Sequence, residues 1–115
     1  MPYHQRDLLL VPIPFSDLTR RKLRPVVVLS NDRYNRDGSD VLVAGITSQL
    51  ITRDYTVPLD TPELEVGMMK RPSVVRADKV FSIDQRIVVS QFGRVGTGAF
   101  DRILNQLSTL IARGA

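Results

Sequence analysis

The sequence predicts a mainly β fold, an antiparallel sheet or small barrel that one C-terminal helix covers on one side. Two patterns support this prediction. Five or six short apolar stretches are separated by turn-forming residues, which is typical of strands. From Gly96 onward the apolar residues recur at three- and four-residue spacing, which predicts an α-helix over about 97–113. A sheet with one helical cover satisfies both patterns.

Length and composition predict a single domain over 1–115 that meets a polyanion. A chain of 115 residues can build an ordinary core, and 43% hydrophobic with 24% charged residues is typical of globular proteins. The formal net charge of +4 favours a partner such as nucleic acid. No apolar run approaches the ~20 residues that span a bilayer, and the N-terminus lacks the pattern of a signal peptide. We therefore expect no membrane association and a cytoplasmic location.

Several classes of catalytic chemistry are excluded by residue counts. The chain has no cysteine, which excludes disulfides, thiolate catalysis and Cys-based zinc sites. His4 is the single histidine, so one chain cannot build a two-histidine ribonuclease site or a His-rich metal site. The acidic residues are scattered, which disfavours a two-metal nuclease. We expect no metal and no cofactor.

In the first half of the chain, the expected strands lie between proline and turn residues. A strand over 8–11 should end at Pro12 and Pro14, which cannot donate to a ladder. The aliphatic run 25–29 predicts a strand buried on both faces, with Arg24 extended at its edge because it precedes Pro25. Further along, the pattern predicts one short helical turn within 31–38 and a strand over 41–46.

In the second half, the pattern alternates more clearly between strand and turn. Pro58 should keep the strand around Val57 at a sheet edge. The connection 60–72 contains Pro62, Gly67 and Pro72, and we expect it to be irregular. The remaining expectations are a strand over 73–82, a turn over 83–85, a last strand over 86–95 and a helix capped by Thr97.

Two polar segments are candidates for phosphate binding. The first loop holds Phe15, Arg20, Arg21 and Lys22, the mixture expected of a flap that meets phosphates and stacks on a base. The alternative is a solvated charge run at a hairpin tip. The strand over 41–46 is followed by hydrogen-bonding side chains, which form either a plain strand end or a donor cluster for a phosphate oxygen. These side chains are Thr47, Ser48 and Gln49.

The residues that remain suit metal-free cleavage of RNA. RNA supplies its own nucleophile, the 2′-hydroxyl, so cleavage needs a base, an acid and cations near the phosphate. Arg24, Arg76, Asp78 and Thr47 offer those groups. Arg76 and Asp78 share a strand face, since side chains alternate along a strand. The alternatives are a surface salt bridge for this pair and a solvated or ion-paired surface residue for Arg24.

Several short motifs follow one another along the chain. They are DLLLV at 7–11, RPVVVLS at 24–30, YN at 34–35, ITSQ at 46–49, SVVRADKV at 73–80, SID at 82–84 and GRV at 93–95. In this order they resemble MazF/PemK-type toxins, the endoribonuclease partners of type II toxin-antitoxin pairs. The resemblance implies an SH3-like antiparallel β-barrel with short helices and a C-terminal α-helix. It also implies a homodimer that cuts single-stranded RNA without metal, and a cognate antitoxin whose disordered tail folds along the basic groove.

The resemblance also implies roles for individual residues. Arg24 and Thr47 match the catalytic Arg and Thr of MazF-like members, and Arg76 and Asp78 match the acid and base of PemK/Kid-like members. The expected RNA-binding residues are Phe15, Arg20, Arg21, Lys22, Asn35, Ser48, Gln49 and Lys79.

The chain departs from the family in two places. The first loop lacks the Gly-x-Glu-Gln of many MazF relatives and the loop histidine of Kid, which leaves the RNA sequence preference and the identity of the base open. Arg6 replaces the usual glycine before Asp7. A second hypothesis keeps the same fold without catalysis, either a CcdB-like gyrase-binding toxin or a non-catalytic nucleic-acid-binding barrel. A gyrase binder has no chemical need for Arg24, Thr47 and the Arg76/Asp78 pair.

Overall fold

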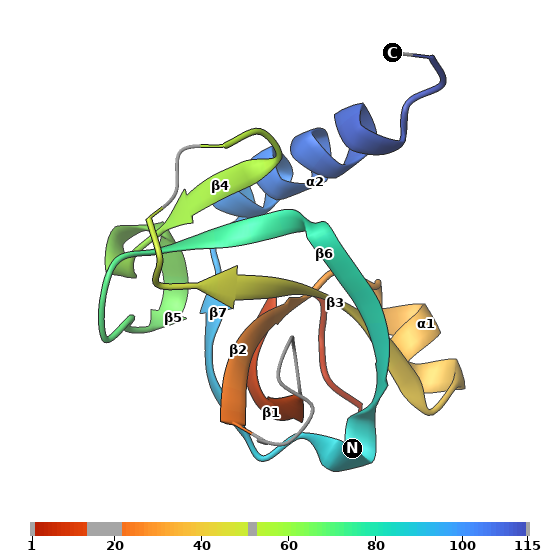
Figure 1. The fold of residues 1–115 in the computed structure, drawn as a ribbon. Coiled ribbons are helices and arrows are strands. Elements are labelled where there is room, and N and C mark those ends of the chain that lie inside the picture. The colour runs from red at the N-terminus through yellow and green to blue at the C-terminus, as the bar shows by residue number, and fades with distance from the viewer. Residues whose placement is uncertain (1, 14–21, 51–52, 115) are drawn as a thin grey trace.

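The structure is a computed structural model that describes residues 2–13, 22–50 and 53–114. Within these residues seven strands form one antiparallel sheet in the order β4-β6-β3-β2-β1-β7-β5, which curls into a half-barrel (Figure 1). The strands are β1 (Asp7–Ile13), β2 (Lys22–Val28), β3 (Asp40–Thr47), β4 (Thr56–Leu59), β5 (Leu64–Gly67), β6 (Ser73–Asp84) and β7 (Ser90–Val95). The helices are α1 (Asp32–Asp37), η1 (Thr61–Glu63), η2 (Gln85–Ile87) and α2 (Thr97–Ile111). The predicted mainly β fold with a C-terminal helix is confirmed.

The sheet buries side chains on both faces, because it curls around one apolar cluster and carries a second on its other face. β2 shows the division clearly: Val27 packs in one cluster, while Val26 and Val28 pack in the other. All three are fully buried, as the aliphatic run predicted. Two faces of burial fix the position of β2 at the centre of the sheet, so the residues just before Val26 have a defined orientation.

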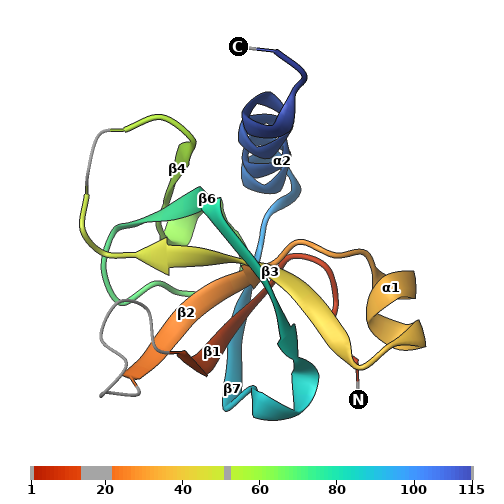
Figure 2. The ribbon, with the colours of Figure 1, turned by 45° about the vertical axis from the view of Figure 1, so that its right-hand side comes forward.

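α2 packs its first half on the sheet and extends beyond it at its C-terminal end (Figure 2). Ala99, Phe100 and Ile103 are its buried residues, which confirms the predicted three- and four-residue spacing. The prediction that Thr97 caps the helix is wrong, since the N-cap is Gly96 and makes no side-chain bond. A Cβ at Gly96 would lie 3.0 Å from the Glu63 carbonyl oxygen, so close approach to η1 favours glycine there. None of the described helices is long and apolar enough to cross a membrane.

The first two strands are longer than predicted. β1 continues through Pro12 to Ile13. Its described pairing with β7 ends at Leu10, so Pro12 lies where β1 has β2 as its paired neighbour, and proline is tolerated at such an open edge. β2 begins at Lys22, so Arg24 lies inside a strand rather than at its edge.

The connection 60–72 is more regular than predicted. It contains η1 and β5, and β5 pairs with β7. The missed feature is a capping box: the Asp60 carboxylate accepts a bond from the Thr61 N–H (2.8 Å), and the Glu63 carboxylate accepts one from the Asp60 N–H (2.7 Å). This Asp-x-x-Glu spacing around a proline is visible in the sequence, and it makes the sheet larger than the predicted five or six strands.

The turn expected over 83–85 is also displaced. β6 pairs with β3 as far as Asp84, opposite Asp40, so the strand continues past Ile83. Asp84 then caps η2 by accepting a bond from the Arg86 N–H (2.8 Å). The last strand therefore starts at Ser90 instead of Arg86.

Candidate functional site

A cleft of about 810 Å³ lies where β2, β3 and β6 meet the loop after β5. Its lining is partly cationic, with Arg24, Arg76 and Lys79 among the residues that face it. Thr47, at the end of β3, also lines the cleft. Three of the four residues predicted to be catalytic thus come together in one cavity, although they lie far apart in the sequence.

Strand register explains why these side chains share one face. Val26 of β2 lies opposite Gly45 of β3, and this register, continued by two residues, puts Arg24 opposite Thr47. Gly45 lies in turn opposite Arg76 of β6. Because alternate residues of a strand point to the same face, Arg24, Thr47 and Arg76 project from the same side of the sheet. Gly45, which carries no side chain, also lines the cleft beside them.

β6 bends beside this group of side chains. Arg76 pairs with Gly45 and Val80 pairs with Ala44, so three residues of β6 have no counterpart on β3. Such a bulge bends the strand and redirects its side chains. Lys79 lies within this bulge and is exposed on the cleft lining. The bend therefore adds a third cation to the cleft.

Arg76 and Asp78 form a two-pronged ion pair. Arg76 Nε donates to Asp78 Oδ1 at 2.8 Å, and Arg76 Nη2 donates to Asp78 Oδ2 at 2.7 Å. The side chains are 17% and 25% exposed. The Arg76 hydrogen bonds lower the pKa of the Asp78 carboxyl and raise the pKa of Arg76, so both groups are charged at neutral pH. Asp78 is not among the residues that line the cleft, and it reaches the cavity through Arg76.

The predicted RNA-binding residues divide into four groups. Ser48 and Gln49 are exposed and line the cleft, as Lys79 does. Lys22 is exposed at the start of β2 but does not line the cleft. Phe15, Arg20 and Arg21 lie outside the described residues. Asn35, in α1, is 1% exposed and does not line the cleft.

The buried position of Asn35 is explained by its hydrogen bonds. Its side-chain amide donates to the carbonyl oxygens of Tyr3 (3.0 Å) and Ser30 (3.1 Å). These bonds hold the N-terminal segment and the residues after β2 against α1. The structure does not bring Asn35 to the cleft, and its expected contact with RNA stays a prediction.

Comparison with known proteins identifies the family. The model of the PemK-like, MazF-like toxin of type II toxin-antitoxin system matches residues 4–111 of the chain. The chain belongs to this toxin family. No curated protein sequence matches the chain.

Solved structures of toxins share the fold at low sequence identity. An endoribonuclease in complex with its cognate antitoxin from Mycobacterial species is 16% identical with a TM-score of 0.76, and the match covers 98% of each chain. MazE-MazF from Deinococcus radiodurans gives 21% identity, a TM-score of 0.75 and 99% coverage of each chain. Mycobacterium tuberculosis toxin MazF-mt6 gives 22% identity and a TM-score of 0.74, with 90% of this chain and 94% of that chain covered. The half-barrel and its C-terminal helix are thus the MazF-like fold.

Sequence reasoning missed part of the cleft of this MazF-like chain. Met68, Lys70, Arg71 and Phe92 also line it. The first three belong to the connection that was expected to be irregular, and Phe92 belongs to the last strand. Their approach to Arg24 depends on the pairing of β5 with β7 and of β7 with β1. No local pattern in the sequence records those pairings.

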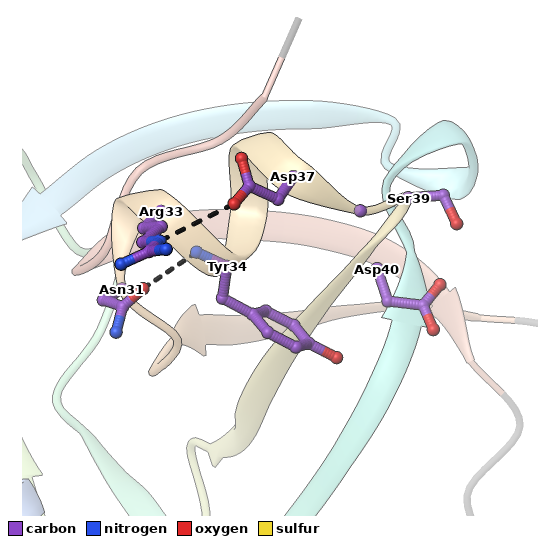
Figure 3. Close-up of a pocket in the computed structure, with 7 residues that line it drawn as sticks. Asn31, Arg33, Tyr34, Asp37, Ser39 and Asp40 are labelled. Carbon is purple, nitrogen blue, oxygen red and sulfur yellow. Dashed lines mark hydrogen bonds and ion pairs between the residues drawn. The ribbon is translucent and has the colours of Figure 1, made fainter.

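A second hollow, of about 530 Å³, lies beside α1 and is a weaker candidate (Figure 3). Two of its charged side chains pair with each other within the helix, Arg33 with Asp37 at 3.7 Å. Asn31 caps α1 by accepting a bond from the Tyr34 N–H at 2.8 Å. In the part of the chain that the structure describes, no three His, Cys, Asp or Glu side chains gather as metal ligands would. The cleft at Arg24 is the better candidate site.

Proposed function

We propose that this chain is an endoribonuclease toxin that cuts single-stranded RNA in the cleft, without metal, by attack of the 2′-hydroxyl on the adjacent phosphorus. Cleavage of mRNA then inhibits translation and growth. The observation that carries this proposal is the strand register that gathers Arg24, Thr47 and Arg76 on one face of a cleft, in a member of a toxin family. Two arginines beside a hydroxyl donor are suited to a phosphorane, whose charge grows as the reaction proceeds.

Each group in the cleft has a chemical role in this proposal. Arg24 and Arg76 stabilise the developing negative charge on the phosphoryl oxygens. The Thr47 hydroxyl accepts a bond from the Gln49 N–H (3.1 Å), which leaves its own hydrogen free to donate to a phosphoryl oxygen. Ser48 and Gln49 offer further polar contacts to the RNA beside it, and Lys79 adds positive charge.

Asp78 is the proposed base, and its ion pair sets a condition on that role. A carboxyl with a lowered pKa and both oxygens bonded to Arg76 is a weak base. A phosphate that binds Arg76 competes for the same guanidinium and so releases Asp78. In this scheme Asp78 orients Arg76 before RNA binds, and accepts the 2′-hydroxyl proton once the phosphate has taken its place. The P–O5′ bond breaks as the O2′–P bond forms, which leaves a 2′,3′-cyclic phosphate. Arg76, the proposed acid, gives a proton to the leaving 5′-oxygen and regains one from Asp78.

The proposed partners and location follow from the toxin family and the charge of the cleft. The active form is a cytoplasmic homodimer, and a cognate antitoxin inhibits it with a disordered tail that folds along the same groove. An acidic or amphipathic tail suits a cleft lined by Arg24, Arg76 and Lys79, and wide contact repays the cost of ordering it. Unchanged RNA affinity in saturating antitoxin would count against a shared groove.

The deciding experiment is incubation of the purified protein with a long single-stranded RNA in EDTA. We expect discrete cleavage products from the wild type and intact RNA from Arg24→Ala. Intact RNA with the wild type, or the same products from both proteins, contradicts the proposal. A supercoiling assay covers the alternative: inhibited gyrase together with uncut RNA would favour a gyrase-binding toxin.

A further inference from the structure

The loop after β5 forms a second cationic rim of the cleft. Lys70 and Arg71 are exposed and line the cavity. Figures 1 and 2 show this loop passing beside the end of β3, where Thr47 lies. The backbone of the loop is held at both ends, because the Met69 N–H donates to Thr61 Oγ1 (3.0 Å) and Ser73 Oγ donates to the Arg71 carbonyl oxygen (3.2 Å). The two cations are therefore carried on a supported segment.

Lys70 and Arg71 differ from several other cations of the chain because they have no carboxylate partner among the described residues. Arg76, Arg86 and Arg94 each bind a carboxylate of the chain. Among the described residues, no carboxylate lies within ion-pair distance of Lys70 or Arg71. Within the part of the chain that the structure describes, no carboxylate neutralises their charge, and both side chains line the cavity.

Charge balance argues that these cations do not serve the phosphate that is cut. One phosphodiester carries a single negative charge, and it already faces Arg24 and Arg76 in the proposed reaction. Two further cations on a separate rim match additional phosphates of the same strand. Each phosphate that a protein neutralises releases counterions, which favours binding regardless of base sequence.

We propose that Lys70 and Arg71 form a subsite for a flanking phosphate of single-stranded RNA, next to the one that is cleaved. This inference rests on the proposed function, since it names the part of the cleft that holds the rest of the substrate. The subsite positions the strand and contributes to binding rather than to the chemical step. Substrates that contain only the scissile phosphodiester therefore gain nothing from it.

The first test measures RNA binding without cleavage. The probe is a mixed-sequence single-stranded RNA, 2′-O-methylated throughout so that it has no nucleophile, and its Kd is measured over a range of salt concentrations. We expect Lys70→Ala and Arg71→Ala each to weaken binding several-fold and to lower the slope of log Kd against log salt by about 0.7 per lost phosphate contact. Arg102→Ala, which removes an exposed cation from α2, is the matched control and should change neither value.

The second test locates the contact along the strand. After the cleavage position has been mapped, each flanking phosphate of a short substrate is replaced in turn by a neutral methylphosphonate. At one flanking position the replacement should raise the KM of the wild type but add no further loss to Arg71→Ala, while kcat stays within about two-fold. Such non-additivity shows that the side chain and the phosphate interact.

Three outcomes would overturn the inference. One is an unchanged Kd and salt slope in Lys70→Ala and Arg71→Ala. The second is that the effects of Arg71→Ala and of the methylphosphonate add fully at every flanking position, or that the variants lose as much activity on a dinucleoside monophosphate as on a longer RNA. The third is normal RNA binding with reduced affinity for the antitoxin, which would assign the two cations to the antitoxin. A wild type that binds RNA through these residues but cuts none would refute the proposed function and leave the subsite standing.

Discussion

Two arginine–carboxylate pairs occupy different regions of the sheet and contrast in what they connect. Asp7 of β1 pairs with Arg94 of β7 at 3.0 Å, and the two residues are 87 positions apart. Arg76 and Asp78 are two positions apart on the single strand β6. The Asp7–Arg94 pair joins two strands, so it contributes to the sheet itself. The Arg76–Asp78 pair joins no elements, which leaves Arg76 available to a ligand.

The surroundings of the two pairs reinforce this difference. Asp7 is 1% exposed, and its second oxygen accepts a bond from the His4 N–H at 2.8 Å. Arg94 also lies 3.8 Å from Glu65, which pairs with Arg6 at 3.0 Å. This N-terminal network (Arg6, Asp7, Glu65, Arg94) ties the N-terminal segment to β1, β5 and β7. We infer that similar ion pairs serve stability in one region and RNA cleavage in the other.

The largest expected effect separates the two regions by activity. Arg76→Gln should lower kcat for RNA cleavage by about 10²–10³-fold, because a cation at the developing charge is lost. The free energy of unfolding should change by less than about 1 kcal/mol, since the pair is partly exposed. The measurements are single-turnover cleavage and urea denaturation.

A matched control exists at the end of the same strand, where Asp84 of β6 meets Arg86 of η2. Asp84 and Arg86 form the same two-pronged pair, two positions apart, but they do not line the cleft. Arg86→Gln should leave cleavage unchanged. Equal losses of activity in Arg76→Gln and Arg86→Gln would remove the distinction between the cleft and the rest of the surface.

The second prediction is that substitutions in the N-terminal network lower stability and leave the rate of cleavage unchanged. Arg94→Ala leaves the Asp7 carboxylate buried without its cation, and we expect the free energy of unfolding to fall by about 3 kcal/mol. Asp7→Asn should cost less, because Arg94 is 29% exposed and can be hydrated. In both variants kcat per folded molecule should stay at the wild-type value. A loss of kcat in the folded fraction would show that the two regions are coupled.

The features that could be predicted from the sequence are those that depend on the local spacing of apolar and polar residues. The aliphatic run of β2 and the spacing in α2 gave their burial, and strand alternation placed Arg76 and Asp78 on one face. Asp7 and Arg94 are separated by most of the chain, so their pairing was not accessible to such patterns.

The same limit explains the missed part of the candidate site. Lys70 and Phe92 reach the cleft only because β5 and β7 extend the sheet beyond β1. The prediction of an irregular connection over 60–72 was wrong for a different reason. It rested on the prolines and the glycine, whereas the capping box at Asp60 is a local signal for the short helix that forms there. Resemblance to a family supplied the catalytic assignments that periodicity could not, and those assignments stay predictions.

The third prediction concerns backbone strain within the N-terminal network. Arg6 has a φ of +80°, a conformation in which residues other than glycine are disfavoured by about 1–2 kcal/mol. Its guanidinium donates to Glu65 Oε1 (3.0 Å) and to the Val95 carbonyl oxygen (2.8 Å), which offsets that strain. Both Arg6→Ala and Arg6→Gly lose these bonds, but only the alanine variant keeps the strain.

We therefore expect Arg6→Ala to be less stable than Arg6→Gly by about 1 kcal/mol in urea denaturation, the opposite of their order in a regular helix or strand. This order would also explain why the family usually has glycine before Asp7. Equal stabilities, or a more stable alanine variant, would show that the position relaxes out of the left-handed region.

The smallest expected effect is on carboxyl pKa values, and it tests whether RNA opens the Arg76–Asp78 pair. The pKa of Asp78 is lowered mainly by its hydrogen bonds to Arg76, and the hydrogen bonds from Arg86 lower that of Asp84 to about 2. A folded-state pKa below the unfolded value stabilises the fold above pH 3.8, and this contribution is lost as the pH falls toward 2. Arg76→Gln should raise the pKa of Asp78 toward its ordinary value of 3.8, and so remove the part of this acid-dependent loss of stability that comes from Asp78.

An uncleavable RNA should also raise the pKa of Asp78, but it should leave the pKa of Asp84 unchanged. If the phosphate displaces Asp78 from Arg76, NMR titration of the carboxyl groups should show that the pKa of Asp78 rises in the complex. The pKa of Asp84 should stay at about 2, because its pair does not line the cleft. An unchanged pKa for Asp78 in saturating RNA would mean that the pair stays closed. The 2′-hydroxyl proton would then have to go to a group other than Asp78.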